Sequence, residues 1–140
     1  MIQKNWTATK TLRQSKLFIA PNRQKTNRIL SLNKSSLSIL TGLFTGHCPV
    51  KYHLRKLKRC DTDICRFCDY EIETSEHLLC SCVALYSRRR QFFNKDILSP
   101  LEIWMESPNK VVEFILRIIP DWGNSHYQTL AFTQNGNMPC

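Results

Sequence analysis

The amino-acid sequence predicts a mainly α fold, a small helical domain with one cysteine-rich turn and a disordered C-terminal tail. Three observations support this fold class. Apolar residues recur at helical spacing in several segments, five of the seven cysteines lie between residues 60 and 82, and residues 121–140 show no periodicity. The length of 140 residues suits one domain with a modest hydrophobic core.

Four helices are expected in the first part of the chain, with breaks near Pro21 and Gly46. Asn22 and Asn33 are residue types that favour the N-cap position, and Gly46 fits the position just after a helix end. Pro49 suits the first turn of the helix that follows it. The expected helical segments are 6–19, 23–32, 34–44 and 50–58.

One long helix and two short helices are expected after a turn-dominated segment over residues 59–73. Glu76 would lie in the first turn of the long helix, where it favours the helix dipole, and this helix is expected to continue to Phe93. The last helix is expected to end at Pro120. The three helices are expected to begin at Thr74 or Ser75, at Ser99-Pro100 and at Ser107-Pro108.

The net charge of +9 changes sign along the chain at Asp61. Residues 1–60 hold thirteen Lys or Arg and no acid, whereas residues 61–140 hold seven Lys or Arg and all eleven acids, which gives +13 in front and −4 behind. The excess of positive charge in residues 1–60 favours a polyanionic partner. Because residues 1–60 contain no carboxylate, they cannot host catalysis by paired carboxylates or by two metal ions. By composition the chain divides into a basic helical segment (1–59), a cysteine-rich turn plus helix (60–94), short C-terminal helices (95–119) and a disordered tail (120–140).

The hydropathy pattern gives no membrane-spanning segment. No apolar run approaches the roughly 20 residues that a transmembrane helix needs. The N-terminal segment also lacks the apolar stretch of a signal peptide. We therefore expect an intracellular protein, in the nucleus or the cytoplasm, without a membrane partner.

The cysteine-rich segment has the most specific chemistry in the sequence. It reads Cys65-x2-Cys68-x8-His77-x4-Cys82. A Cys-x2-Cys turn can direct two thiolates at one ion, and a His and a Cys from the next helix can complete a tetrahedron. Zinc accepts this combination of ligands, and four protein ligands leave no open coordination position. The sequence therefore predicts a zinc-knuckle turn with a structural role.

Three cysteines, Cys82, Cys80 and Cys60, are alternatives for the fourth ligand. His77 and Cys82 are five residues apart, which places them about 140° apart around an α-helix. Cys80 is separated from His77 by about 60° and faces the same side. Helical geometry alone therefore favours Cys80, and Cys82 reaches the site if the first helical turn is distorted. Cys60 is a third alternative, although residues 61–64 separate it from the turn.

Several short motifs resemble the C-terminal end of arthropod non-LTR retrotransposon polyproteins, of the jockey and related kinds. In these polyproteins a reverse transcriptase is followed by a type-1 RNase H domain and then by a Cys/His segment. The resemblance covers about residues 6–115. The motifs are LTGLFTGHC at 40–48, His53-Leu54, CRFC at 65–68 and ETSEHLLCSC at 73–82, while Trp6 and LRQSK at 12–16 resemble the linker after the RNase H domain.

The resemblance implies a CCHC zinc finger, whereas the departures from the family pattern predict no enzymatic activity in this chain. Its ligands would be Cys65, Cys68, His77 and Cys82, because His-x4-Cys is the usual closing pair in that family. The catalytic carboxylates of RNase H and of reverse transcriptase are absent, since no acid precedes Asp61 and no strand-like segment carries paired aspartates. We therefore expect a truncated, non-enzymatic remnant of such a polyprotein.

A basic patch directly precedes the expected zinc site. Basic side chains neutralise phosphates and aromatic rings stack on unpaired bases, so the patch predicts binding of RNA or single-stranded DNA with little sequence preference. Its residues are Lys51, Tyr52, Arg55, Lys56, Lys58 and Arg59. The Arg88-Arg89-Arg90 triplet offers either a second phosphate patch or a complement to a helix C-terminus. Because the cysteine-rich segment is acidic apart from Arg66, we expect the metal to hold the basic patch in place rather than to contact phosphate.

The alternative hypothesis is a structural or interaction module. Such a module would brace the RNase H or polymerase domain of the parent polyprotein without contacting nucleic acid. In this interpretation the apolar helix over 111–118 and Trp104 form a docking face. The two hypotheses differ in whether Arg55, Lys56 and Lys58 contribute to nucleic-acid affinity.

Overall fold

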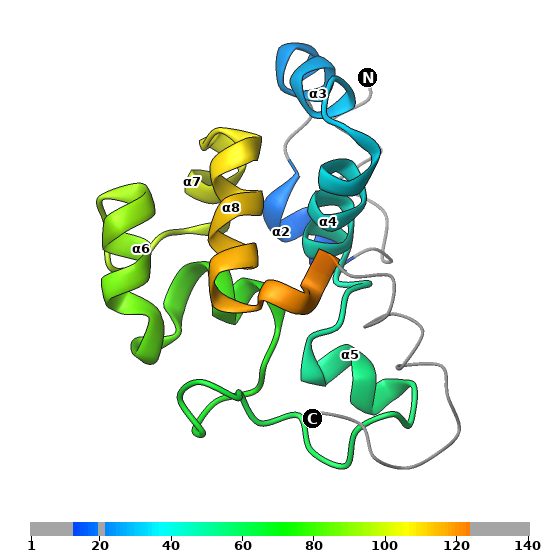
Figure 1. Cartoon of the computed structure of the whole chain (residues 1–140), viewed down its shortest axis with the longest axis vertical. Coiled ribbons are helices and arrows are strands. Elements are labelled where there is room, and N and C mark those ends of the chain that lie inside the picture. Colours follow the sequence, from blue (N-terminus) through cyan, green and yellow to red (C-terminus); the bar gives the residue numbers. More distant parts are fainter. Residues whose placement is uncertain (1–12, 20–21, 124–140) are drawn as a thin grey trace.

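The structure is a computed structural model that describes residues 13–19 and 22–123, and it confirms the expected mainly helical fold (Figure 1). Over these residues the chain forms no strand beyond one antiparallel bridge, between Ile64 and Ile72. None of the described helices is long and apolar enough to traverse a bilayer. The elements are α2 (Arg13–Phe18), α3 (Arg23–Leu30), α4 (Lys34–Thr45), α5 (Lys51–Lys56), η1 (His77–Ser81), η2 (Val83–Leu85), α6 (Tyr86–Phe93), α7 (Pro100–Met105), α8 (Pro108–Ile118) and η3 (Pro120–Gly123).

The capping residues of the sequence set most helix boundaries. The side chains of Asn22 and Asn33 accept hydrogen bonds from backbone N–H groups three residues ahead, at 3.0 and 2.8 Å, and so begin α3 and α4. Gly46 ends α4 with a φ of 80°, a left-handed conformation that glycine adopts without steric cost. Pro49 does not occupy the first turn of α5, because Val50 is the N-cap of that helix.

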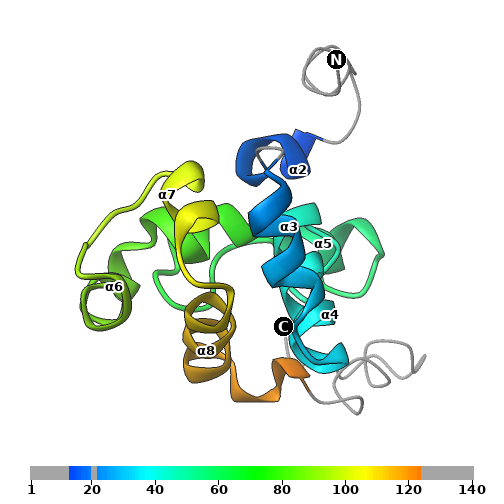
Figure 2. The same cartoon turned by 90° about the horizontal axis from the view of Figure 1, so that it is seen from above.

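One hydrophobic core extends from Phe18 to Trp122. In this core α4 packs against α8, and α2 packs against α7 (Figure 1 and Figure 2). The ring of Phe44 joins the two pairs, because its centroid lies 5.4 Å from that of Phe18 and 5.5 Å from that of Trp104. Trp104 and the apolar face of α8 are therefore buried inside the protein. The prediction that residues 111–118 and Trp104 form a docking face is therefore wrong.

Ordered structure extends past the boundary expected for the C-terminal tail. After α8, residues 120–123 form the 3₁₀ turn η3, which contacts α4 and α8. Trp122 anchors this turn, with 2% of its surface exposed. A single buried aromatic leaves no periodic signal in the sequence, so the sequence pattern places the start of the tail too early, at residue 120. The rest of the expected tail (124–140) and the start of the expected 6–19 helix lie outside the described residues.

The single helix expected over residues 74–93 is wrong. The chain instead forms the π-helical turn η1, an extended Cys82 with a ψ of 120°, the 3₁₀ turn η2 and then α6. The side chain of Arg89 is fully buried and stabilises this interruption. It donates hydrogen bonds to the carbonyl oxygens of Leu78 (3.0 Å), Asp96 (2.6 Å) and Cys82. A regular helix would pair the Leu78 and Cys82 carbonyls internally, so the guanidinium replaces helical hydrogen bonds.

Candidate metal centre

The first two candidate ligands lie on a tight turn defined by backbone hydrogen bonds. The N–H of Cys65 donates to the carbonyl of Glu71 at 2.7 Å, next to the isolated antiparallel bridge. The N–H of Asp69 donates to the carbonyl of Cys65 at 3.0 Å, and Asp69 has a φ of 53°, which Asp tolerates better than most residues. This turn brings Cys65 and Cys68 to the same side of the segment.

The other two candidate ligands are brought together by η1. The N–H of Cys82 donates to the carbonyl of His77 at 2.7 Å, a bond between residues five apart. In a π-helical turn, residues five apart therefore lie one turn above each other, as residues four apart do in an α-helix. The geometric preference for Cys80 assumed a regular α-helix, and the π-helical turn removes that assumption. Single π-helical turns are frequent at functional sites.

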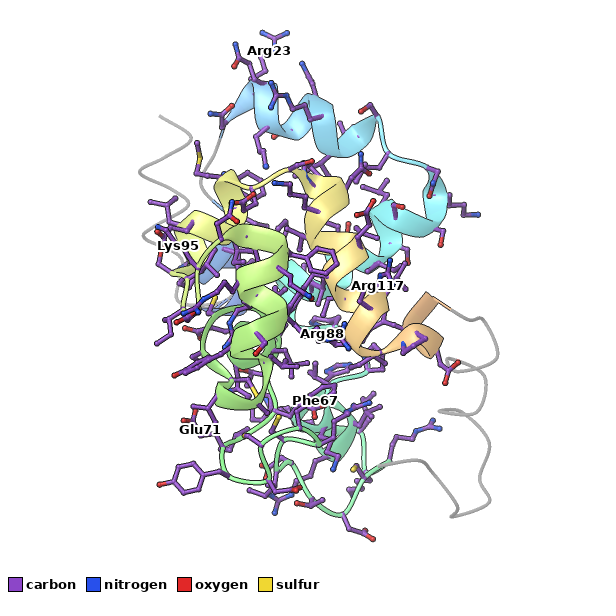
Figure 3. All side chains as sticks on the ribbon, turned by 60° about the vertical axis from the view of Figure 1, so that its left-hand side comes forward. Arg23, Phe67, Glu71, Arg88, Lys95 and Arg117 are labelled. Atoms are coloured by element: carbon purple, nitrogen blue, oxygen red, sulfur yellow. The ribbon has the colours of Figure 1, made fainter. Side chains whose placement is uncertain are left out.

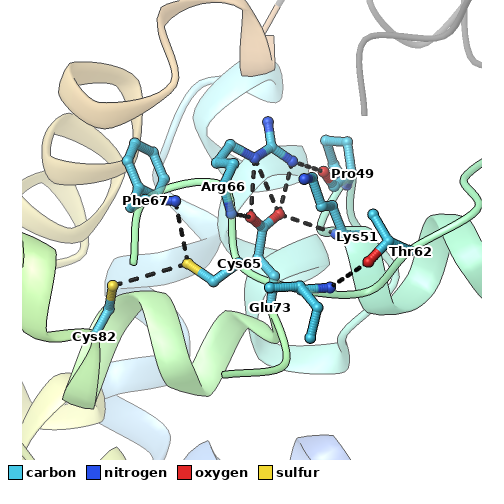
Figure 4. Close-up of polar contacts among 9 residues, drawn as sticks. Pro49, Lys51, Thr62, Cys65, Arg66, Phe67, Glu73 and Cys82 are labelled. Carbon is cyan, nitrogen blue, oxygen red and sulfur yellow. Dashed lines mark hydrogen bonds and ion pairs between the residues drawn. The ribbon is translucent and has the colours of Figure 1, made fainter. Parts of the chain in front are cut away.

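Four side chains converge where the turn meets η1. The ligand atoms of Cys65, Cys68, His77 and Cys82 all lie within 4.8 Å of one another. The Sγ atoms of Cys65 and Cys82 are 3.8 Å apart (Figure 4), and Cys68 Sγ lies 3.4 Å from His77 Nε2. Zinc–ligand bonds at tetrahedral angles separate two sulfurs by about 3.8 Å, and a sulfur from a nitrogen by about 3.6 Å. The four side chains could therefore hold a metal ion, and the two shortest spacings match those of a tetrahedral zinc site.

Neither alternative ligand belongs to this cluster. Cys80 lies among the core residues, and its carbonyl accepts a hydrogen bond from the N–H of Leu98 at 3.1 Å. Burial, together with the charge of nearby Glu76, raises the pKa of the Cys80 thiol to about 12. Cys80 therefore acts as a small apolar core residue. Cys60 is buried as well and is not among the four clustered residues.

His77 is buried, and its two ring nitrogens face different partners. Nε2 faces the thiols, while Nδ1 lies 3.2 Å from a carboxylate oxygen of Glu71 without an aligned hydrogen bond to any described residue. Metal-binding histidines commonly donate their second N–H to a carboxylate, so Glu71 is placed to orient the ring. Burial lowers the pKa of His77, although Glu71 opposes this. The imidazole is therefore held neutral, which is the form that binds a metal ion.

The three thiols of the cluster differ in their surroundings. Burial raises the pKa of Cys65, and burial with the neighbouring charge of Cys65 raises the pKa of Cys82 to about 12. Slight burial also tends to raise the pKa of Cys68. Hydrogen bonds from the backbone of Glu71 and Tyr70 outweigh this effect, so the pKa of Cys68 is lowered. A metal ion must therefore displace protons from Cys65 and Cys82 in order to bind.

Zinc binding is expected to release protons. The raised pKa values keep Cys65 and Cys82 protonated in the metal-free chain at pH 7, so we expect about two to three protons to be released per zinc ion. The apparent affinity for zinc should consequently rise with pH and fall on acidification. Calorimetric titrations in two buffers of different ionisation enthalpy measure the number of protons. Release of no protons would contradict a site with three thiolates.

A buried carboxylate, which the sequence pattern did not reveal, joins the cluster to α5. Glu73 is fully buried and accepts hydrogen bonds from the backbone N–H groups of Lys51 (3.0 Å) and Arg66 (2.8 Å). The guanidinium of Arg66 pairs with the same carboxylate at 2.7 Å (Figure 4). The carbonyl of Glu73 accepts from the N–H of Tyr52 at 3.1 Å. A lone arginine in an acidic segment is the sequence signal for this pair, and the pair connects α5 to the segment that leads to His77.

The six residues predicted to bind nucleic acid are not equally exposed. Lys51 is buried and Arg59 is half-buried. Asp63 forms an ion pair with Arg55 at 2.9 Å, in which the arginine side chain is 56% exposed. Exposed ion pairs of this kind are weak, so the guanidinium can exchange Asp63 for a phosphate. The exposed part of the basic patch consists of Tyr52, Arg55, Lys56 and Lys58.

The Arg88-Arg89-Arg90 triplet does not form a shared phosphate patch. Arg88 is exposed on α6 (Figure 3), whereas Arg89 is buried and binds backbone carbonyls. Arg90 forms an ion pair with Asp96 at 2.6 Å and is the basic residue in the last turn of α6. The phosphate-patch interpretation is therefore wrong for Arg89, and only Arg90 has the helix-terminal position that complements a helix dipole.

Comparison with known proteins identified no relative of this chain. No family model, curated protein or solved structure matches this chain. The features that bear on function are therefore the Cys65–Cys68–His77–Cys82 cluster and the distribution of charge around it.

Proposed function

We propose that this chain is a zinc-binding module that binds RNA or single-stranded DNA through the exposed part of its basic patch. The observation that carries the proposal is the convergence of four zinc-ligand side chains, in a segment that contacts α5 through Glu73. Zinc would have a structural role, because four protein ligands leave no open coordination position. Binding of the ion would then contribute directly to the free energy of folding.

The proposal extends to the origin of the chain, as a C-terminal remnant of a non-LTR retrotransposon polyprotein. The order of the motifs at 40–48, 65–68 and 73–82 supports this origin. The ligand set that the resemblance implies is also the set of side chains that converge. The nucleic acid would then be a transcript of the element, and the polymerase and nuclease reactions would belong to other parts of the polyprotein.

The distribution of charge supports phosphate binding by α5 rather than by the metal centre. Residues 22–59 hold nine Lys or Arg and no acid, whereas residues 61–76 hold six acids and one Arg. Phosphates of a nucleic-acid strand would be repelled by the second segment and attracted by the first. Affinity of this electrostatic kind depends strongly on salt and weakly on sequence.

A filter-binding titration with a short single-stranded RNA and a DNA of the same sequence tests the proposal. We expect both to bind at low salt, with affinity falling steeply as salt rises. Changing Arg55, Lys56 and Lys58 together to serine should reduce affinity at least tenfold and should reduce the slope of log affinity against log salt by about two, since each lost phosphate contact on a single strand accounts for roughly 0.7.

A matched triple variant serves as the control. Arg23, Arg28 and Lys34 are equally basic and exposed, and Arg23 lies on α3 at the opposite end of the protein from Phe67 and Glu71 (Figure 3). Serine at these three positions should change affinity much less than serine in the basic patch. Absence of binding at low salt would refute the proposal. Equal losses in the two triple variants would refute the assignment to α5.

A further inference from the structure

A pocket with several polar side chains in its lining lies beside the metal centre, between the C-terminal end of α4 and α5. Its volume is about 680 Å³, which is within the range of small-molecule binding sites. The lining side chains include Thr45, His47, His53, Lys56 and Thr74. None of the described residues that line it is acidic, although six acids lie in the neighbouring segment 61–76. The pocket therefore favours an anionic ligand.

Several hydrogen-bond donors that face this pocket have no acceptor among the described residues. The rings of His47 and His53 lie with their centroids 5.1 Å apart, and among the described residues neither ring has a hydrogen-bond partner. The Nζ atom of Lys56 lies 4.4 Å from the centroid of the Tyr52 ring and forms no ion pair with a described carboxylate. Two imidazoles and one ammonium group are consequently available to a ligand that carries several acceptor oxygens.

We propose that this pocket binds the phosphate group of a nucleotide, with His47, His53 and Lys56 donating hydrogen bonds to the phosphate oxygens. The aromatic ring of Tyr52 lines the same pocket and offers a surface against which a base can pack. This proposal rests on the proposed function in one respect only, namely that the phosphate belongs to a nucleic-acid strand. The pocket chemistry itself would also accept a free mononucleotide.

The pocket and the metal centre share a segment of the chain. Thr74 and Ser75 line the pocket, and the Thr74 hydroxyl accepts the backbone N–H of His77 at 3.0 Å. The Ser75 hydroxyl donates to the carbonyl of Leu43 at 2.7 Å, which fixes the segment against α4. An ion bound at His77 would therefore stabilise one wall of the pocket, and its removal should weaken phosphate binding.

Binding of uridine 5′-monophosphate to the zinc-loaded full chain tests the proposal, with uridine as the ligand that lacks the phosphate. Two-dimensional NMR of the imidazole C–H groups reports on His47 and His53 directly. We expect the monophosphate, but not uridine, to shift both resonances, and inorganic phosphate to shift them at higher concentration. Absence of these shifts with the monophosphate would overturn the proposal.

Two variants and a matched control locate the site. Lys56→Gln and the double variant His47→Gln/His53→Gln should each lower affinity for uridine 5′-monophosphate at least tenfold. Lys34→Gln removes an exposed lysine at the other end of α4, about 16 Å along the helix axis, and should change affinity less than twofold. Equal affinity of the wild-type chain and both pocket variants would overturn the proposal.

The same proteins separate this proposal from the proposed function. Monophosphate binding without any RNA binding would refute the proposed function and support a site for a free nucleotide. Unchanged RNA affinity in the double histidine variant would refute use of the pocket by a strand, while leaving the basic patch as the RNA-binding surface. Loss of both activities in the pocket variants, with unchanged circular dichroism, would support the two proposals together.

Discussion

Replacing Cys82 with alanine is expected to remove tightly bound zinc, whereas replacing Cys80 with alanine should leave one zinc ion per chain. Both thiols are buried, with 0% and 3% of their surface exposed, so each change removes one sulfur atom from a packed interior. They differ because only Cys82 lies in the four-residue cluster. Loss of one ligand in four should cost roughly 3 kcal/mol of binding free energy, which corresponds to about a hundredfold loss of affinity.

Metal content after dialysis and competition with a chromogenic chelator measure this difference. Cobalt substitution adds a spectroscopic check, since the visible spectrum of a tetrahedral site reports how many sulfurs bind the ion. Zinc retained by Cys82→Ala and lost by Cys80→Ala would reverse our assignment and would require a regular α-helix at residues 77–81. Wild-type chain that folds without zinc and is unaffected by chelators would refute the metal centre itself.

The parts of the fold that the sequence predicts are those that depend on neighbours in the chain. Asn22 and Asn33 cap helices because each side chain reaches a backbone group three residues away. Leu40, Leu43 and Phe44 are buried because their spacing places them on one face of α4. Such features need no knowledge of the rest of the molecule, so local pattern is sufficient for them.

The features that the sequence did not predict depend on contacts between distant segments. The π-helical turn at residues 77–81 occurs where Arg89, farther along the chain, supplies hydrogen bonds to the broken helix. Lys51 belonged to the predicted phosphate-binding set, but its backbone binds Glu73 and its side chain is buried. The cysteine spacing left three candidates for the fourth ligand, and helical geometry favoured Cys80, whereas the backbone hydrogen bonds of the π-helical turn bring Cys82 to the cluster.

Replacing Arg89 with methionine is expected to lower the free energy of unfolding by about 3–5 kcal/mol, a large part of the stability of a small domain. Methionine fills a similar volume but cannot bind the carbonyls of Leu78, Cys82 and Asp96, so two buried acceptors and one half-buried acceptor lose a charged donor. Arg89→Lys should recover little, because one ammonium group cannot reproduce the planar arrangement of donors. Denaturant unfolding of the zinc-loaded chain measures the change.

Arg88→Met provides the matched control, because Arg88 lies on the same helix with its side chain in solvent. We expect its effect on stability to be within about 0.5 kcal/mol. Because Arg89 binds the carbonyl of a cluster residue, Cys82, its loss should also speed the removal of zinc by a chelator, which a change in helix propensity alone would not do. Similar effects of the two substitutions on unfolding and on zinc release would show that the buried guanidinium does not support the π-helical turn.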